Sequence, residues 1–179
     1  MTDFLHALSG QSSAFTATTN RYVIGPTAEL RLPFGFGVEV DALYRHFSYN
    51  GSSTGGGSTT TGGAWEFPLL AKYRLKVLPL VHPFVDGGVA WDKLSGLTQT
   101  VTKVVSGAAG TSSTSNPAEL NTDVTAGFVI GGGVELKILR LRIAPELRYT
   151  RWNDAHFVAS NGLLHSNLNQ GEFLVGLTF

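Results

Sequence analysis

Residues 131–152, GGGVELKILRLRIAPELRYTRW, alternate between apolar and charged side chains over most of their length. Before the turn, Val134 and Leu136 alternate with Glu135 and Lys137, and after the turn the same pattern resumes. Successive side chains of a β-strand point to opposite faces, so a period of two indicates strands. The stretch therefore predicts two antiparallel strands joined by a short turn, each with one apolar and one charged face.

The same period recurs through the rest of the 179-residue chain and predicts seven strands. Their approximate ranges are 21–31, 36–49, 65–76, 82–93, 123–138, 142–152 and 170–179. Short turns follow the first, third and fifth strands. Long segments follow the second, fourth and sixth strands, at 50–64, 94–122 and 153–169. We expect long loops at one end of an up-and-down sheet and short turns at the other, with residues 50–64 as a flexible Gly-, Ser- and Thr-rich connector.

The charged side chains of these strands fall almost entirely on one face, with Lys93 and Arg151 as exceptions near the long-loop end. In a soluble lipocalin-like barrel the charged face is outside, and Phe67, Phe128 and Ile130 would line a ligand cavity. In a membrane barrel the two faces are exchanged. Alternation alone does not distinguish these arrangements, because a period of two is the same from either side.

Three features favour the membrane arrangement. Aromatic side chains gather toward strand ends on the apolar face, where tyrosine and tryptophan suit a bilayer interface. The charges on the charged face are matched in number, with nine basic and ten acidic residues, as a packed charged interior requires. The chain also ends on an alternating apolar strand. The expected lipid-interface aromatics are Tyr22, Tyr44, Trp65, Trp91, Tyr149 and Phe179.

Taken together, YVIGPTAELRLPFGFGVEVDALYRHF, FPLLAKYRLK, VHPFVDGGVAW, residues 131–152 and the terminal FLVGLTF resemble small outer-membrane β-barrels of the OmpA/OmpX type. The resemblance implies an antiparallel up-and-down transmembrane β-barrel, eight strands when complete, in the bacterial outer membrane. It further implies that the barrel-assembly machinery recognises a terminal signal. By this resemblance the signal is Phe173, Val175, Leu177 and Phe179.

An odd strand count departs from that family, because bacterial single-chain barrels have even numbers and an open edge cannot face lipid. We therefore expect residues 1–20 to be the remnant of a first strand and the first external loop, and residues 21–179 to be the barrel. The stretch MTDFLHALSGQSSAF lacks the basic start and continuous apolar core of a signal peptide. We expect the signal peptide and the start of the first strand to have been lost.

Several function classes find no support in the sequence. A net charge of zero argues against a nucleic-acid surface, and the absence of cysteine excludes disulfides. The sequence contains no stretch of about 18 apolar residues, so it predicts no transmembrane helix. The histidines lack ligand spacing, so we predict no metal site and no cofactor. His46 with Ser48, and Asp154 with His156, are conceivable rim dyads of an outer-membrane hydrolase, but we interpret them as solvated residues and predict no enzyme.

The inward-facing charged residues are the main chemical feature of the predicted barrel. We interpret them as a paired network that plugs the lumen, because an eight-stranded barrel is filled by its own side chains. The alternatives are a narrow channel or a carrier of small lipophilic molecules. We expect a monomer with a structural or surface-interaction role, surrounded by outer-membrane lipid. The predicted network comprises Glu29, Glu39, Asp41, Arg45, Glu66, Lys72, Arg74, Asp86, Glu135, Lys137, Glu146, Arg148 and Glu172.

Overall fold

A computed structural model describes residues 5–7, 13–19, 23–53, 56–75, 80–105, 108–116, 120–138, 141–156 and 164–178. Over these ranges the chain is all-β, and its one helical element is the 3-10 turn Pro33–Gly35. No helix within them reaches the length and apolar character that a membrane-spanning helix requires. The strands are β1 Leu5–Ala7, β2 Ser13–Thr19, β3 Thr27–Arg31, β4 Phe36–Asp41, β5 Leu43–Ser53, β6 Gly56–Arg74, β7 Val81–Val105, β8 Ala108–Thr114, β9 Val124–Ile138, β10 Leu141–Trp152, β11 Leu164–Ser166 and β12 Asn169–Thr178.

The main sheet has the predicted antiparallel up-and-down order. Hydrogen-bonded neighbours follow β12–β10–β9–β7–β6–β4–β3, while β5 continues β4 beside β6, and β2 and β8 extend the sheet by pairing with β5 and β7. All of these pairs are antiparallel. The seven strands of the sequence analysis are therefore present, the first as β3 and the second as β4 and β5, and the all-β prediction is confirmed. Strand β2 lies within residues 1–20, outside the seven predicted strands.

The predicted barrel closure is not reached by the described residues. The sheet ends at β3 on one side and at β12 on the other, and these two edges do not pair with each other. An even number of antiparallel steps separates them, so both edges run in the same direction. Antiparallel closure would need one more strand between them, which is the physical reason that seven strands leave the sheet open.

The long-loop end of this seam is partly covered by β1. The strand pairs antiparallel with β11, in the register Leu5↔Ser166 to Ala7↔Leu164, and it also contacts β2. Since β11 leads directly into β12, β1 runs in the direction opposite to both edges. That direction is the one required of a strand closing the seam.

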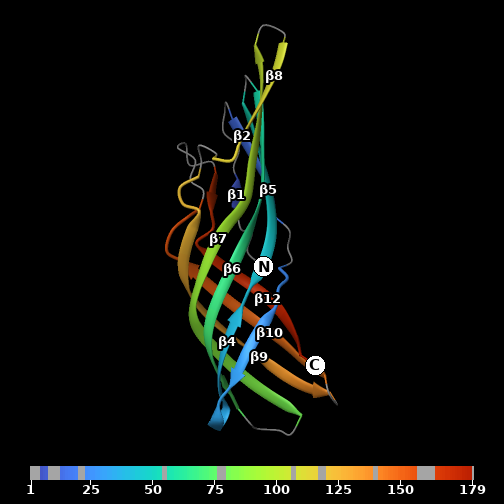
Figure 1. Ribbon diagram of the computed structural model, residues 1–179, viewed down its shortest axis with the longest axis vertical. Helices are drawn as coiled ribbons and strands as arrows, with labels where there is room; N and C mark the ends of the chain where they lie inside the picture. The colour runs from blue at the N-terminus through green and yellow to red at the C-terminus, as the bar shows by residue number, and fades with distance from the viewer. Residues whose placement is uncertain are drawn as a thin grey trace.

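The long connections differ from the predicted loops. Much of residues 50–64 and 94–122 forms strand, because β5, β6, β7 and β8 continue as paired hairpins well beyond the sheet. These hairpins appear as the narrow ribbon in the upper half of Figure 1. Threonine, being β-branched, favours extended backbone, and cross-strand neighbours such as Thr59 and Thr100 supply pairing that composition alone does not indicate. The interpretation of residues 50–64 as a flexible connector was therefore wrong.

A β-bulge separates the ribbon from the broad sheet. The register of β6 against β7 shifts between Thr61 and Gly63, and Gly96 of β7 adopts φ 61°, a left-handed conformation that glycine accommodates without strain. On the broad-sheet side of the bulge the outward side chains are apolar and aromatic, as at Trp65. On the ribbon side they include Thr100, so the bulge coincides with the end of the apolar surface nearest the long connections.

On the broad sheet the charged side chains are buried and the large apolar side chains are exposed, which is the reverse of the arrangement in a soluble protein. Along β6, Glu66 and Lys72 are 0% and 4% exposed, whereas Trp65 and Leu69 are 37% and 41% exposed. The alternation continues along the strand, where Leu70 faces inward and is buried. Charged side chains therefore fill the concave face, and apolar side chains cover the convex face.

This burial decides the placement of the residues that a lipocalin-like cavity would use. Phe67, Phe128 and Ile130 are 40%, 66% and 64% exposed on the outer face. The expectation that they line an internal ligand cavity is wrong, because the charged face of each strand is the one that the sheet encloses.

Candidate functional site

Ion pairs span the concave face of the sheet. Arg148 of β10 reaches Asp41 of β4 with an Nη1–Oδ2 distance of 2.8 Å, and Arg31 of β3 reaches Glu135 of β9 with an Nη2–Oε2 distance of 2.8 Å. In each case several strands lie between the partners in the sheet order. Such contacts are possible only because the sheet curls strongly, and the curvature of its lower half is visible in Figure 1.

The cluster nearest the short turns contains two arginines and two glutamates. Arg74 pairs with Glu29 and, at 3.2 Å, with Glu135. Arg31 contacts the same two carboxylates, at 3.4 Å from Glu29 and 2.8 Å from Glu135. The charges of this four-residue cluster balance, and it links β3, β6 and β9.

The middle cluster contains three carboxylates and two cations. Arg148 contacts Glu146 at 2.7 Å, Asp41 at 2.8 Å and Glu39 at 3.4 Å. Lys72 Nζ lies 2.5 Å from Glu39 and 3.8 Å from Glu146. All five side chains are buried, so each charge depends on its neighbours rather than on water.

Asp86 lies beside this cluster in space left by a glycine. A Cβ atom at Gly131 would meet Asp86 Oδ1 at 2.4 Å and Glu146 Oε1 at 3.2 Å. Asp86 is buried, and neither of its carboxylate oxygens has a hydrogen-bond partner among the described residues. The missing side chain at Gly131 thus admits a further carboxylate to the interior.

A third cluster lies toward the long-loop end. Arg45 pairs with Glu66 and, at 3.2 Å, with Glu172. Gln170 donates from Nε2 to Glu172 at 2.9 Å and accepts from Trp152 Nε1 at 2.7 Å. The cluster connects β5 and β6 with the edge strand β12 and with β10, again across the interior.

The residues of the conceivable hydrolase dyads lie in different surroundings. His156 is 2% exposed, its Nε2 lies 3.6 Å from Asp92 of β7, and its Nδ1 lies 2.9 Å from the carbonyl oxygen of Thr122. Asp154 uses its backbone to bond the hydroxyl of Thr125. The side chains of His46 and Asp154 are exposed. The interpretation of these residues as solvated therefore agrees with His46 and Asp154 and is wrong for His156, which is buried beside Asp92.

The predicted interior network is mostly assembled. Every predicted member joins one of the three clusters except Asp86, which lies beside the middle cluster, and Lys137. Lys137 is exposed, and within the described part of the chain no carboxylate pairs with it. Sequence reasoning missed Asp92 and Gln170, which are buried in the interior, and Arg31, whose side chain is 40% exposed but pairs with interior carboxylates. The signal was present, since Arg31 and Asp92 fall on the charged parity of their strands.

The outer face carries aromatic pairs at two levels. Toward the long loops, the Tyr44 and Trp65 rings lie 5.1 Å apart, and Trp65 stacks on Phe67 at 6.2 Å. Near the short turns, Phe36 and Tyr73 lie 4.9 Å apart.

The other predicted outward residues follow the same face. Trp91 and Tyr149 are exposed on it, while Tyr22 and Phe179 lie outside the described residues. On β12 the remaining residues of the predicted assembly signal are all exposed. These are Phe173, Val175 and Leu177.

No known family model matches this chain, and comparisons with curated proteins and with solved structures also gave no match. Function is therefore inferred from the geometry of the chain itself.

Proposed function

We propose that this chain is an integral outer-membrane β-barrel protein with a structural or surface-interaction role and a lumen plugged by paired charges. One observation carries the proposal: charged side chains are buried on the concave face while large apolar side chains cover the convex face. In water this arrangement would expose a broad hydrophobic surface and pay for burying many charges. In a bilayer the same surface contacts lipid, and the charges lie inside.

The dimensions of the apolar surface support this placement. Tyr73 lies eight residues after Trp65 on the outward face of β6, which corresponds to about 26 Å along the strand. At the roughly 40° tilt of outer-membrane strands, this is about 20 Å across the bilayer. The paired aromatics mark both limits, as girdles flank the apolar band in such barrels.

The interior supports a plug rather than a conducting path. Three charge clusters follow one another along the concave face, and in each one the cations contact carboxylates on other strands. Side chains held in this way leave little freedom for ions to pass. We therefore expect vesicles containing the protein to show only background flux of small ions.

A closing strand completes the proposal. The edges β3 and β12 run in the same direction, and β1 runs oppositely beside β11. A continuation of β1 toward the short turns would lie between the two edges and satisfy the backbone groups of both. With this strand the sheet would become an eight-stranded barrel, delivered by the barrel-assembly machinery through the terminal apolar strand and monomeric in outer-membrane lipid.

The experiment uses the chain's tryptophans as depth probes. Two variants each retain one tryptophan, either Trp65 on the outer face or Trp152 in the interior, with phenylalanine at the other positions. Each is refolded into phosphatidylcholine vesicles whose acyl chains carry bromine, a contact quencher of indole fluorescence. We expect brominated lipid to quench Trp65 strongly and Trp152 weakly, because Trp152 is only 4% exposed and hydrogen-bonded to Gln170.

Two results would contradict the proposal. One is equal quenching of the two tryptophans, which would remove the distinction between outer and inner faces. The other is a chain that stays monomeric in water without detergent and whose Trp65 fluorescence is not quenched by brominated vesicles. A soluble barrel would then be the better interpretation.

A further inference from the structure

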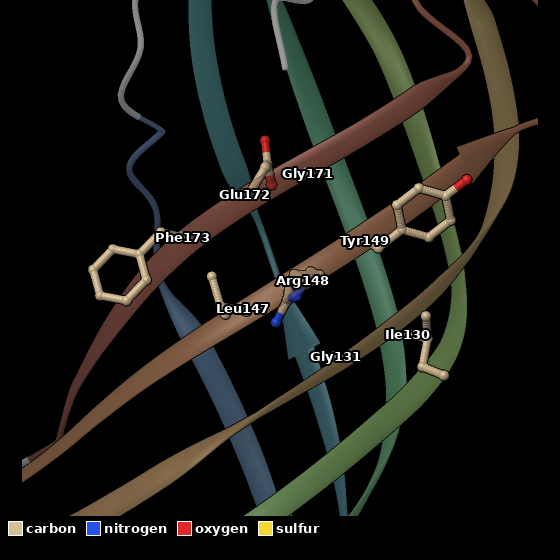
Figure 2. A pocket seen from close by; sticks show the side chains of 8 residues that line it. All are labelled: Ile130, Gly131, Leu147, Arg148, Tyr149, Gly171, Glu172 and Phe173. Atoms are coloured by element: carbon tan, nitrogen blue, oxygen red, sulfur yellow. The ribbon is translucent and has the colours of Figure 1, made fainter. Parts of the chain in front are cut away.

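A shallow groove of about 460 Å³ crosses the outer face of β9, β10 and β12. Four large apolar side chains surround it, namely Ile130, Leu147, Tyr149 and Phe173, all at least 45% exposed. In Figure 2 the Phe173 and Tyr149 rings lie at opposite ends of the lining, with Leu147 between them. Gly171 pairs directly with Tyr149, and its missing side chain leaves the hollow beside the ring.

Polar and positively charged side chains, Asn169 and Arg151, lie just outside the lining of the groove, beside its end at Tyr149. The Tyr149 hydroxyl donates to Asn169 Oδ1 at 2.7 Å, and Arg151 Nη1 donates to the same oxygen at 2.5 Å. Arg151 is exposed on the outer face, and no carboxylate of the described residues pairs with it. The arginines of the three interior clusters, in contrast, all have carboxylate partners.

We propose that this groove binds one phosphate-bearing membrane lipid, with an acyl chain along the apolar hollow and the phosphate at Arg151. The proposal rests on the membrane placement proposed above. Charge complementarity identifies the occupant: a guanidinium with free N–H donors suits a phosphate, and the adjoining apolar hollow suits a hydrocarbon chain. The charge also lies one step beyond Tyr149 on the same face, at the level where a lipid headgroup meets the aromatic girdle.

The test measures lipid retained by the protein. The chain is refolded into mixed phosphatidylcholine and phosphatidylglycerol vesicles and extracted in a nonionic detergent, and the bound phosphatidylglycerol is counted by native mass spectrometry. Arg151→Gln should reduce retention about tenfold, the effect of losing one charge-assisted contact. Gly171→Val should reduce retention similarly by filling the hollow.

Lys93→Gln is the matched control, since Lys93 is also an exposed, outward-facing cation near the long-loop end but lies on β7, a strand that contributes no residue to the groove. It should retain the wild-type amount of phosphatidylglycerol. The proposal would be overturned if Lys93→Gln and Arg151→Gln lost equal amounts of phosphatidylglycerol while Gly171→Val lost none. That result would indicate that anionic lipid is attracted to any cation near the aromatic girdle. Equal retention by all variants would overturn it too.

Quenching of Trp65 by brominated lipid separates the two proposals, when each lipid-site variant is also made in the chain that retains only Trp65 and refolded into brominated vesicles. If Trp65 is quenched and no phosphatidylglycerol is retained by the wild type, the lipid site is wrong and the membrane placement stands. If Trp65 is not quenched in any variant, the membrane placement is wrong and the lipid site falls with it.

Discussion

Arg148→Met should be among the most damaging single changes to this chain. Arg148 is 3% exposed and contacts Glu146 at 2.7 Å, Asp41 at 2.8 Å and Glu39 at 3.4 Å. Methionine keeps much of the side-chain length but removes the charge. Lys72 would then be the only described cation in contact with the cluster, and Asp41 would have none. Removing one partner from a buried ion pair costs roughly 3–5 kcal/mol in the free energy of unfolding.

The measurement is urea unfolding of the protein in phosphatidylcholine vesicles, followed by tryptophan fluorescence. Lys93→Met is the matched control, because Lys93 is an exposed cation on the outer face, where substitution should change stability by about 0.5 kcal/mol or less. Adding Asp41→Asn to Arg148→Met should recover part of the loss, since a neutral amide needs no counter-charge. Equal costs for Arg148→Met and Lys93→Met would refute the assignment of Arg148 to a buried network.

Two further predictions concern the outer face and the interior packing. Ile130→Arg should cost roughly 2–4 kcal/mol in vesicles, as a cation does near the bilayer midplane, whereas Thr100→Arg on the hairpin ribbon should cost at most about 1 kcal/mol; equal costs would argue against lipid around Ile130. Gly131→Ala should cost about 1–3 kcal/mol, because its Cβ would lie 2.4 Å from Asp86 Oδ1. Gly110→Ala meets no atom within 4 Å and should be nearly neutral in the same urea assay.

The strands of this chain were predictable because their signal is local. Apolar and charged residues alternate within each strand, and the observed β9, β10 and β12 lie close to the predicted ranges. The hairpin ribbon was not predictable in the same way. Its Gly-, Ser- and Thr-rich residues resemble a flexible loop in composition, and its strands are held by partners such as Thr59 and Thr100 that are distant in sequence.

The candidate network was likewise predictable only in part. That Arg148 and Asp41 belong to the charged face follows from the parity of their own strands. That they contact each other does not, because 107 residues separate them and the contact depends on how far the sheet curls. The groove likewise arises from side chains of three neighbouring strands, β9, β10 and β12, and no single segment predicts it.

The ion pairs and the open seam constrain each other. Pairs such as Arg31–Glu135 and Arg45–Glu172 join strands that lie far apart in the sheet order, and they therefore hold the sheet in its curled form. Curling alone cannot join the edges, because both run in the same direction and the rest of the sheet pairs only antiparallel neighbours. In water each unpaired edge could bond solvent, but in lipid it could not. The charge network therefore suits a membrane only when a further strand, running in the direction of β1, pairs with both edges of the sheet. Closure of the barrel and insertion into the bilayer each depend on that strand.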